Sequence, residues 1–202
     1  MRGAFLEAAS APYVSEREQP LALVAAIGNP DRGDDGLGPA VARQLRGRVR
    51  PGVRILERSG DTLALIEDWN GVPYVILVDA MAPLGAPGRV HRLDLTDSPL
   101  SIGFAAGSTH AFGVAETIEL ARSLGRLPEH LIAYLIEGER FATGTPLSQA
   151  AAGAVDEAAQ RIVMELSTIL AAKGDRTCMR RHWCAMSSAG SRSWRARAAR
   201  AV

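Results

Sequence analysis

The segment Leu21–Ile27 reads LALVAAI and is followed by Gly28-Asn29-Pro30. Seven apolar residues closed by turn-forming residues predict a strand that is buried on both faces. Leu37, Val41 and Leu45 then recur at helical spacing, so a helix should follow the strand. A buried strand joined to an amphipathic helix is the repeating unit of a parallel α/β sheet, and this pair of elements therefore indicates the fold class.

Strands and helices continue to alternate along the rest of the chain. The predicted strands are Val53–Glu57, Tyr74–Asp79, Arg89–Asp94 and Leu131–Ile136, and the predicted helices are Thr62–Trp69, a segment after Gly107, and Ser148–Ala171. We predict a three-layer α/β sandwich, in which a twisted, mostly parallel sheet has helices on both faces. The strand at 89–94 follows 74–79 after a short loop, so we expect one antiparallel edge strand.

Composition limits the domain organisation and the class of partner. The 202 residues suffice for one domain, which we place at 20–172, after a poorly ordered leader at 1–19. The tail at 173–202 is predicted to be disordered, and residues 176–202 hold seven of the 23 basic residues and no acidic residue. The remainder is mildly acidic, which argues against nucleic-acid binding. Without a membrane-length apolar run or an export signal, the expected location is the cytoplasm, with no membrane partner.

Acidic and imidazole side chains follow three of the predicted strands. Asp34 and Asp35 come after the first strand, Asp79 ends the strand at 74–79, and His110 begins the helix after Gly107. Ligands bind open α/β sheets at the carboxyl ends of the strands, so we expect these side chains to meet at that edge. Carboxylates and an imidazole suit a hard or borderline metal ion. Each residue has a structural alternative, because Asp and His also cap helices and stabilise turns.

The glycine-rich loop permits a second interpretation. Residues 33–38 read GDDGLG, and Glu57 ends the second predicted strand, near where a ribose-binding acid lies in dinucleotide-binding folds. The spacing is G-x-x-G-x-G rather than G-x-G-x-x-G. Two carboxylates at a helix N-terminus would also repel a phosphate. A non-catalytic Rossmann-like nucleotide- or metal-binding module remains the alternative.

Four segments of the sequence form an ordered set. The first is residues 27–38, IGNPDRGDDGLG, in which a Gly-Asn turn precedes a paired acid and Gly-x-Gly. The others follow in order: Val78-Asp79-Ala80, Ser108–Gly113 (STHAFG), and the run from Ile136-Glu137-Gly138 to Gly144–Ser148 (GTPLS). Together they resemble the hydrogenase maturation protease family (peptidase family M52), and the resemblance covers about residues 20–172.

The resemblance implies an endopeptidase that removes the C-terminal extension of a nickel-iron hydrogenase large-subunit precursor. It implies that Asp35, Asp79 and His110 are the catalytic, metal-binding residues. The metal would be nickel, carried by the substrate, and its presence would control cleavage. The leader and the arginine-rich tail have no counterpart in the family pattern.

Other hydrolytic mechanisms lack their motifs in this sequence. There is no His-Glu-x-x-His helix and no Gly-x-Ser-x-Gly elbow. Both cysteines, Cys178 and Cys184, lie in the tail, outside the predicted domain. Metal-assisted hydrolysis is the mechanism that the remaining residues support. Asp34 is either a secondary acid or base or a structural turn residue.

Overall fold

The computed structural model describes residues 19–59, 61, 63–97 and 111–194, and these residues form one sheet with helices on both faces. The strands are β1 (Ala22–Ile27), β2 (Val53–Arg58), β3 (Tyr74–Met81), β4 (Val90–Asp94) and β5 (His130–Glu137). Their order across the sheet is β2-β1-β3-β5-β4. The first four strands of that order are parallel, and β4 pairs antiparallel with β5. The predicted mostly parallel sheet with one antiparallel edge strand is confirmed.

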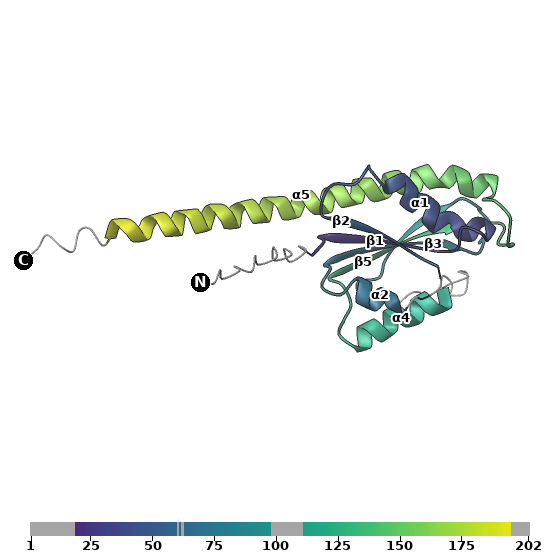
Figure 1. Ribbon diagram of the computed structural model, residues 1–202, viewed down its shortest axis with the longest axis horizontal. Coiled ribbons are helices and arrows are strands. Elements are labelled where there is room, and N and C mark those ends of the chain that lie inside the picture. Colours follow the sequence, from purple (N-terminus) through teal and green to yellow (C-terminus); the bar gives the residue numbers. More distant parts are fainter. Residues whose placement is uncertain (1–18, 60, 62, 98–110, 195–202) are drawn as a thin grey trace, which may run out of the picture.

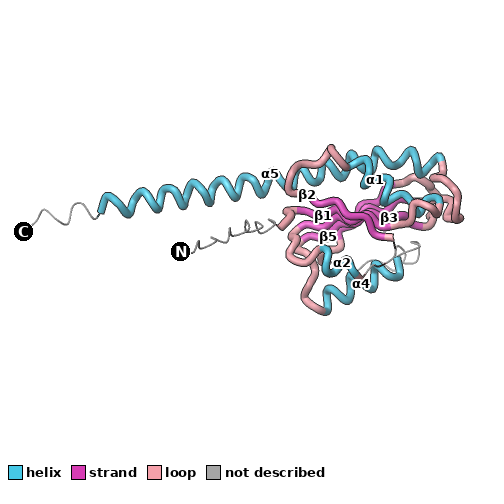
Figure 2. The backbone as a smooth tube through the Cα atoms, viewed as in Figure 1, coloured by secondary structure: helices cyan, strands magenta, loops and turns pink. Residues whose placement is uncertain are grey.

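Helices form the two outer layers of the sandwich. They are the 3-10 helix η1 (Gly33–Gly36), α1 (Leu37–Leu45), α2 (Ala64–Asp68), α4 (Ala111–Ser123) and α5 (Gln149–Trp194). Helices α1 and α5 cover one face of the sheet, and α2 and α4 cover the other (Figure 1). The strands cross as a twisted layer between them (Figure 2).

Strand β1 lies at the centre of the hydrophobic core, as its uninterrupted apolar sequence predicts. Ala22 and Val24 belong to the cluster beneath α1 and α5, whereas Leu23, Ala25 and Ile27 belong to the cluster beneath α2 and α4. Because successive side chains of a strand point to opposite faces, a strand covered on both sides is apolar at every position.

Two strands extend beyond their predicted ends at the carboxyl edge. The sequence prediction made Asp79 the last residue of its strand, but β3 continues through Ala80 and Met81. These two residues pair with Ile136 and Glu137 of β5, which also ends one residue later than predicted. The longer pairing satisfies backbone groups that a strand end at Asp79 would have left unpaired. Asp79 therefore lies within the ladder, near its end.

The last helix differs most from the prediction. Ser148 does precede it, and its hydroxyl accepts a hydrogen bond from the Ala151 N–H as an N-cap does. However, α5 does not end at Ala171. It continues to Trp194 and extends past the sheet, into the segment predicted to be disordered (Figure 1). Residues 172–194 contain no proline, the residue that most strongly disfavours a helix interior. The predicted leader at 1–19 lies almost entirely outside the described residues.

Candidate functional site

The direction in which the chain adds strands to the sheet reverses between β1 and β3. From β1 the chain crosses through α1 to β2 on one side, and β3 lies on the other side of β1. The loops that leave β1 and β3 therefore diverge at the carboxyl edge. Such a topological switch point is where open α/β sheets bind ligands. The loop after β1 carries Asp35, and the end of β3 carries Asp79.

Asp35 lies in η1, the short 3-10 helix between β1 and α1, and its side chain is fully buried. Its Oδ2 accepts a hydrogen bond from the Asn29 N–H at 3.2 Å and lies 3.9 Å from Nη1 of Arg32. Helix η1 packs against β3. These contacts fix one carboxylate beside the strand that carries the second.

Two glycines of the sequence motif allow the close packing around Asp35. Gly28 has a φ of +134°, and a Cβ built there would lie 1.9 Å from the Asp35 carbonyl oxygen. At Gly38 a Cβ would lie 2.2 Å from the Ile27 carbonyl oxygen and 2.8 Å from that of Val78. A side chain at either position would collide with backbone, so only glycine allows this approach. The start of α1 is thereby pressed against the ends of β1 and β3.

Asp79 is 2% exposed, and its Oδ1 accepts a hydrogen bond from the Ala80 N–H at 2.8 Å. Ala26 of β1 pairs with Val78 of β3, so Asp79 is level with Ile27, the last residue of β1. The structure thus brings Asp35 and Asp79 to the same edge of two adjacent strands, as the sequence predicts.

His110, the third predicted ligand, lies outside the described residues. Helix α4 begins at the next residue, Ala111, and leads back to the start of β5. In the described part of the chain, which lacks His110, no three His, Cys, Asp or Glu side chains are grouped as a metal site. Participation of His110 therefore stays a prediction.

Asp34 has a structural role that the sequence left open. Its Oδ2 accepts hydrogen bonds from the N–H groups of Glu139 (2.6 Å) and Arg140 (3.0 Å), and its Oδ1 accepts one from Ser148 (2.6 Å). Burial raises the pKa of Asp34, but these backbone hydrogen bonds outweigh burial and hold the pKa below its ordinary value. Asp34 thus ties the loop after β1 to the loop after β5 and to the start of α5.

Glu137 is a buried acid at the same edge whose role the sequence analysis did not assign. Its Oε2 accepts hydrogen bonds from the N–H groups of Leu84 and Ala86, both at 2.9 Å, and its Oε1 lies 2.7 Å from Nε2 of His91. Burial raises the pKa of Glu137, but the hydrogen bonds, that of His91 foremost, hold it below its ordinary value. An acid that ends an otherwise apolar strand was the available signal, because a buried carboxylate needs partners.

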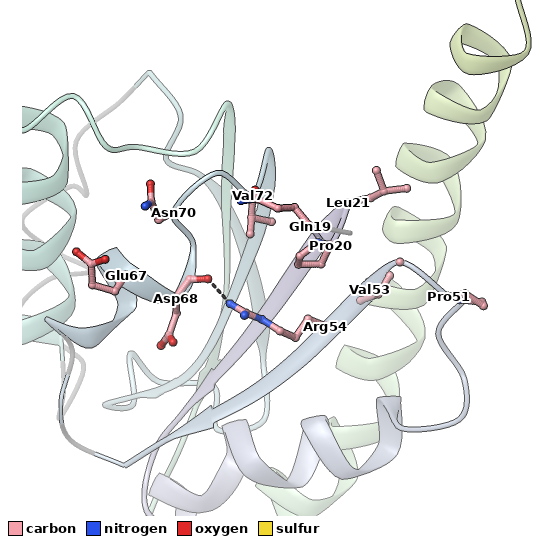
Figure 3. A pocket seen from close by; sticks show the side chains of 11 residues that line it. Gln19, Pro20, Leu21, Pro51, Val53, Arg54, Glu67, Asp68, Asn70 and Val72 are labelled. Atoms are coloured by element: carbon pink, nitrogen blue, oxygen red, sulfur yellow. Dashed lines mark hydrogen bonds between the residues drawn. The ribbon is translucent and has the colours of Figure 1, made fainter. Parts of the chain in front are cut away.

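A cavity of about 970 Å³ lies at the opposite edge of the sheet (Figure 3). Its lining includes Leu21, just before β1, and Val53, at the start of β2. Arg54 lines it too and donates to the Asp68 carbonyl oxygen. Neither Asp35 nor Asp79 lines this cavity, so it is not the candidate site.

Glu57, the acid on which the nucleotide-binding alternative rested, is engaged elsewhere. Its Oε1 lies 2.5 Å from Nη2 of Arg46, at the end of α1. Glu57 is the penultimate residue of β2 rather than its last. An acid already paired with an arginine is poorly placed to bind a ribose hydroxyl.

The sequence matches the model of a known protein family. The sequence model of hydrogenase maturation proteases matches residues 39–165. The chain belongs to the hydrogenase maturation protease family. The matched region includes Asp79 and His110 and begins just after Asp35.

Curated relatives include two hydrogenase expression/formation proteins named HupD. That of Thiocapsa roseopersicina is 27% identical over 118 residues, which cover 57% of this chain and 53% of that protein. That of Bradyrhizobium diazoefficiens is 31% identical over 112 residues, which cover 54% of this chain and 58% of that protein. The chain thus spans little more than half the length of the curated relatives it matches.

Solved structures of maturation proteases share the fold. The hydrogenase maturating endopeptidase HybD from Escherichia coli superposes with a TM-score of 0.65 at 22% identity, covering 73% of this chain and 92% of that one. The nickel-iron hydrogenase maturation protease HybD from Thermococcus kodakarensis gives 0.59 at 25% identity, covering 72% and 97%. Among the helices of the described residues, none has the length and apolar character needed to cross a bilayer.

Proposed function

We propose that this protein is an endopeptidase that removes the C-terminal extension of a nickel-iron hydrogenase large-subunit precursor. One observation supports the proposal: in a chain of the maturation protease family, Asp35 and Asp79 are both buried at the carboxyl edge of the neighbouring strands β1 and β3, at the switch point of the sheet. Carboxylates are common ligands of divalent metal ions, and a metal-bearing substrate would supply such an ion to this edge of the sheet.

Nickel enters this proposal as part of the substrate. Two carboxylates and the His110 imidazole form an incomplete ligand set, which leaves coordination positions for groups of the precursor. Bound nickel would supply Lewis acidity to a carbonyl or to a water. The residues of this chain would orient the metal-bearing segment and hold it at the sheet edge. Asp34 and Glu137 keep the surrounding loops in place and take no part as ligands.

An incomplete ligand set also accounts for selectivity. A precursor without nickel offers Asp35 and Asp79 nothing to coordinate, so it should bind weakly and escape premature cleavage. This is discrimination by a missing interaction rather than by a side-chain pocket.

The proposal is tested by co-expressing the protein with the precursor and following the size of the large subunit. Asp35→Asn and Asp79→Asn each remove a carboxylate charge at nearly constant shape, and His110→Ala removes the imidazole nitrogen donor. We expect each to lower processing by more than about a hundredfold, since the metal needs all its donors. The melting temperature should change little.

Asp94→Asn is the matched control. Asp94 is an exposed acid on β4, and because β4 runs antiparallel, this strand end lies at the opposite edge of the sheet. Its variant should process normally. Full processing by Asp79→Asn or His110→Ala would contradict the assignment of these residues.

A further inference from the structure

The loop at residues 82–89 connects β3 to β4 at the carboxyl edge, and it begins three residues after Asp79. Both of its ends are tied to the end of β5. The Gly138 N–H donates to the Met81 carbonyl oxygen at 2.8 Å, and the Gly88 N–H donates to the Glu137 carbonyl oxygen at 2.7 Å. The loop therefore leaves the strand that carries Asp79, crosses the carboxyl end of β5, and is fixed there at its entry and at its exit.

The middle of the loop is held by the Glu137 carboxylate. Leu84 and Ala86 donate their N–H groups to the same oxygen, Oε2, while His91 contacts Oε1. Glu137 is fully buried, so this carboxylate has lost its hydration and depends on these donors. Pro83 and Pro87 further restrict the backbone on either side. The loop is a rigid element, although it has no regular secondary structure.

The backbone and the side chain of Leu84 have different surroundings. Its N–H is hydrogen-bonded to the buried Glu137 carboxylate, whereas its side chain faces solvent. The residue is 58% exposed. The bound N–H restrains the backbone at Leu84, and the side chain on that backbone is exposed to solvent. An apolar side chain on a rigid support loses little conformational freedom when it binds a partner.

We propose that the 82–89 loop is a wall of the substrate site, that Leu84 contacts the C-terminal segment of the precursor, and that Glu137, supported by His91, is the positioning residue of this wall. This inference rests on the proposed function. Glu137 acts through the loop rather than on the reacting atoms.

The contact is tested with Leu84→Ser in a steady-state cleavage assay on purified nickel-loaded precursor. We expect KM to rise by about three- to tenfold, as for loss of one moderately important apolar contact, with kcat and the melting temperature unchanged. The matched control is Leu124→Ser, because Leu124 is 55% exposed and follows α4 at the other edge of the sheet. It should leave KM unchanged.

The positioning role of Glu137 is tested by amide hydrogen exchange and by combining substitutions at Glu137 and Leu84 in one variant. Glu137→Ala removes the acceptor, so exchange at Leu84 and Ala86 should accelerate at least about tenfold, and adding Leu84→Ser should raise KM little further. Glu137→Gln keeps one oxygen for both N–H groups, so it should restore slow exchange and most of the native KM. If Glu137→Ala does not fold, Glu137→Gln and the exchange rates of the unmodified protein still test the anchor.

The outcomes separate this inference from the proposed function. Normal cleavage with an unchanged KM in Leu84→Ser would contradict the proposed contact between the 82–89 loop and the substrate, but not the endopeptidase activity. Rapid exchange of the Leu84 and Ala86 amides in the unmodified protein would overturn the anchor whatever the activity. Failure of the unmodified protein to cleave would overturn the proposed function and the substrate contact with it.

Discussion

Asp34 and Asp35 are adjacent acids with different surroundings. Asp34 accepts hydrogen bonds from three backbone N–H groups that lie more than a hundred positions away in the sequence. Asp35 accepts one from the nearby Asn29 and lies in η1, which packs against β3. The sequence located the pair in a turn but could not assign the two roles from the residues alone, because the partners of Asp34 come from the far end of the chain.

At this residue scale we predict that Asp34→Asn destabilises the fold. The amide would place its NH2 group against backbone donors, leaving at least one buried N–H without an acceptor, at a cost of about 1–3 kcal/mol in the free energy of unfolding. Urea unfolding measures this loss, and Asp31→Asn, at an exposed position of the same loop, should stay within about 0.5 kcal/mol of the native value.

The hydrogen bonds of Asp34 also determine the direction in which the stability of the fold changes at acidic pH. The pKa of Asp34 is lowered in the folded state, so its contribution is complete above the ordinary Asp pKa of about 3.9 and is lost as the pH falls through the lowered value. Asp34→Asn should therefore lose more stability at pH 7 than at pH 3. An equal loss at both pH values would show that the charge of Asp34 does not contribute.

At the scale of elements, the sequence predicted the bounds of the strands more closely than the end of the last helix. Fully apolar segments such as that of β1 have one stable environment, the middle of a covered sheet, so the centre of the element is easily recognised. The ends depend on pairing: β3 runs past Asp79 because β5 offers partners for Ala80 and Met81. Helix α5 continues past Ala171, where its apolar periodicity ends, and no proline interrupts it before Trp194.

Helix α5 is attached to the edge of the sheet by Glu165. Its carboxylate accepts hydrogen bonds from Arg92 of β4 and, at 2.6 Å, from the Tyr134 hydroxyl of β5. Tyr134 is 2% exposed, so removing its acceptor leaves a buried hydroxyl unpaired. Glu165→Ala should cost about 1–3 kcal/mol in the free energy of unfolding.

The control for this element is Glu157→Ala. Glu157 pairs with Arg161 within α5, and its side chain is 59% exposed. Pairs of this kind contribute about 0.3–0.5 kcal/mol at most. Equal destabilisation by the two variants in urea unfolding would show that Glu165 does not attach α5 to the sheet.

At the scale of the whole molecule, the site is a consequence of topology. The acids after β1 and near the end of β3 lie at the same edge because these strands are neighbours and parallel, and this much could be predicted from the alternation of strands and helices and the position of the acids. The cross-links made by Asp34 and Glu137 could not, because they depend on loop conformations that no periodic pattern encodes.

The part of α5 that extends past the sheet gives a prediction for the molecule as a whole. Truncation after Lys173 removes a segment that lies beyond the sandwich (Figure 1). Among the α5 residues whose side chains the structure describes, which end at Ala171, Leu166 is the last in a core cluster, so the melting temperature and the processing rate should stay nearly unchanged. A large loss of thermal stability would mean that the segment packs on the domain, and a loss of processing alone would mean that it recruits the substrate.

The central claim is that the protein cleaves its precursor only when nickel is present in it, and one measurement tests this directly. The purified protein is incubated with nickel-loaded and with nickel-free large-subunit precursor, and the mass of each product is determined. We predict loss of the C-terminal extension from the nickel-loaded precursor, at a rate at least about a hundredfold above that of the nickel-free form. Equal cleavage of both forms would contradict nickel control, and cleavage of neither would contradict the endopeptidase itself.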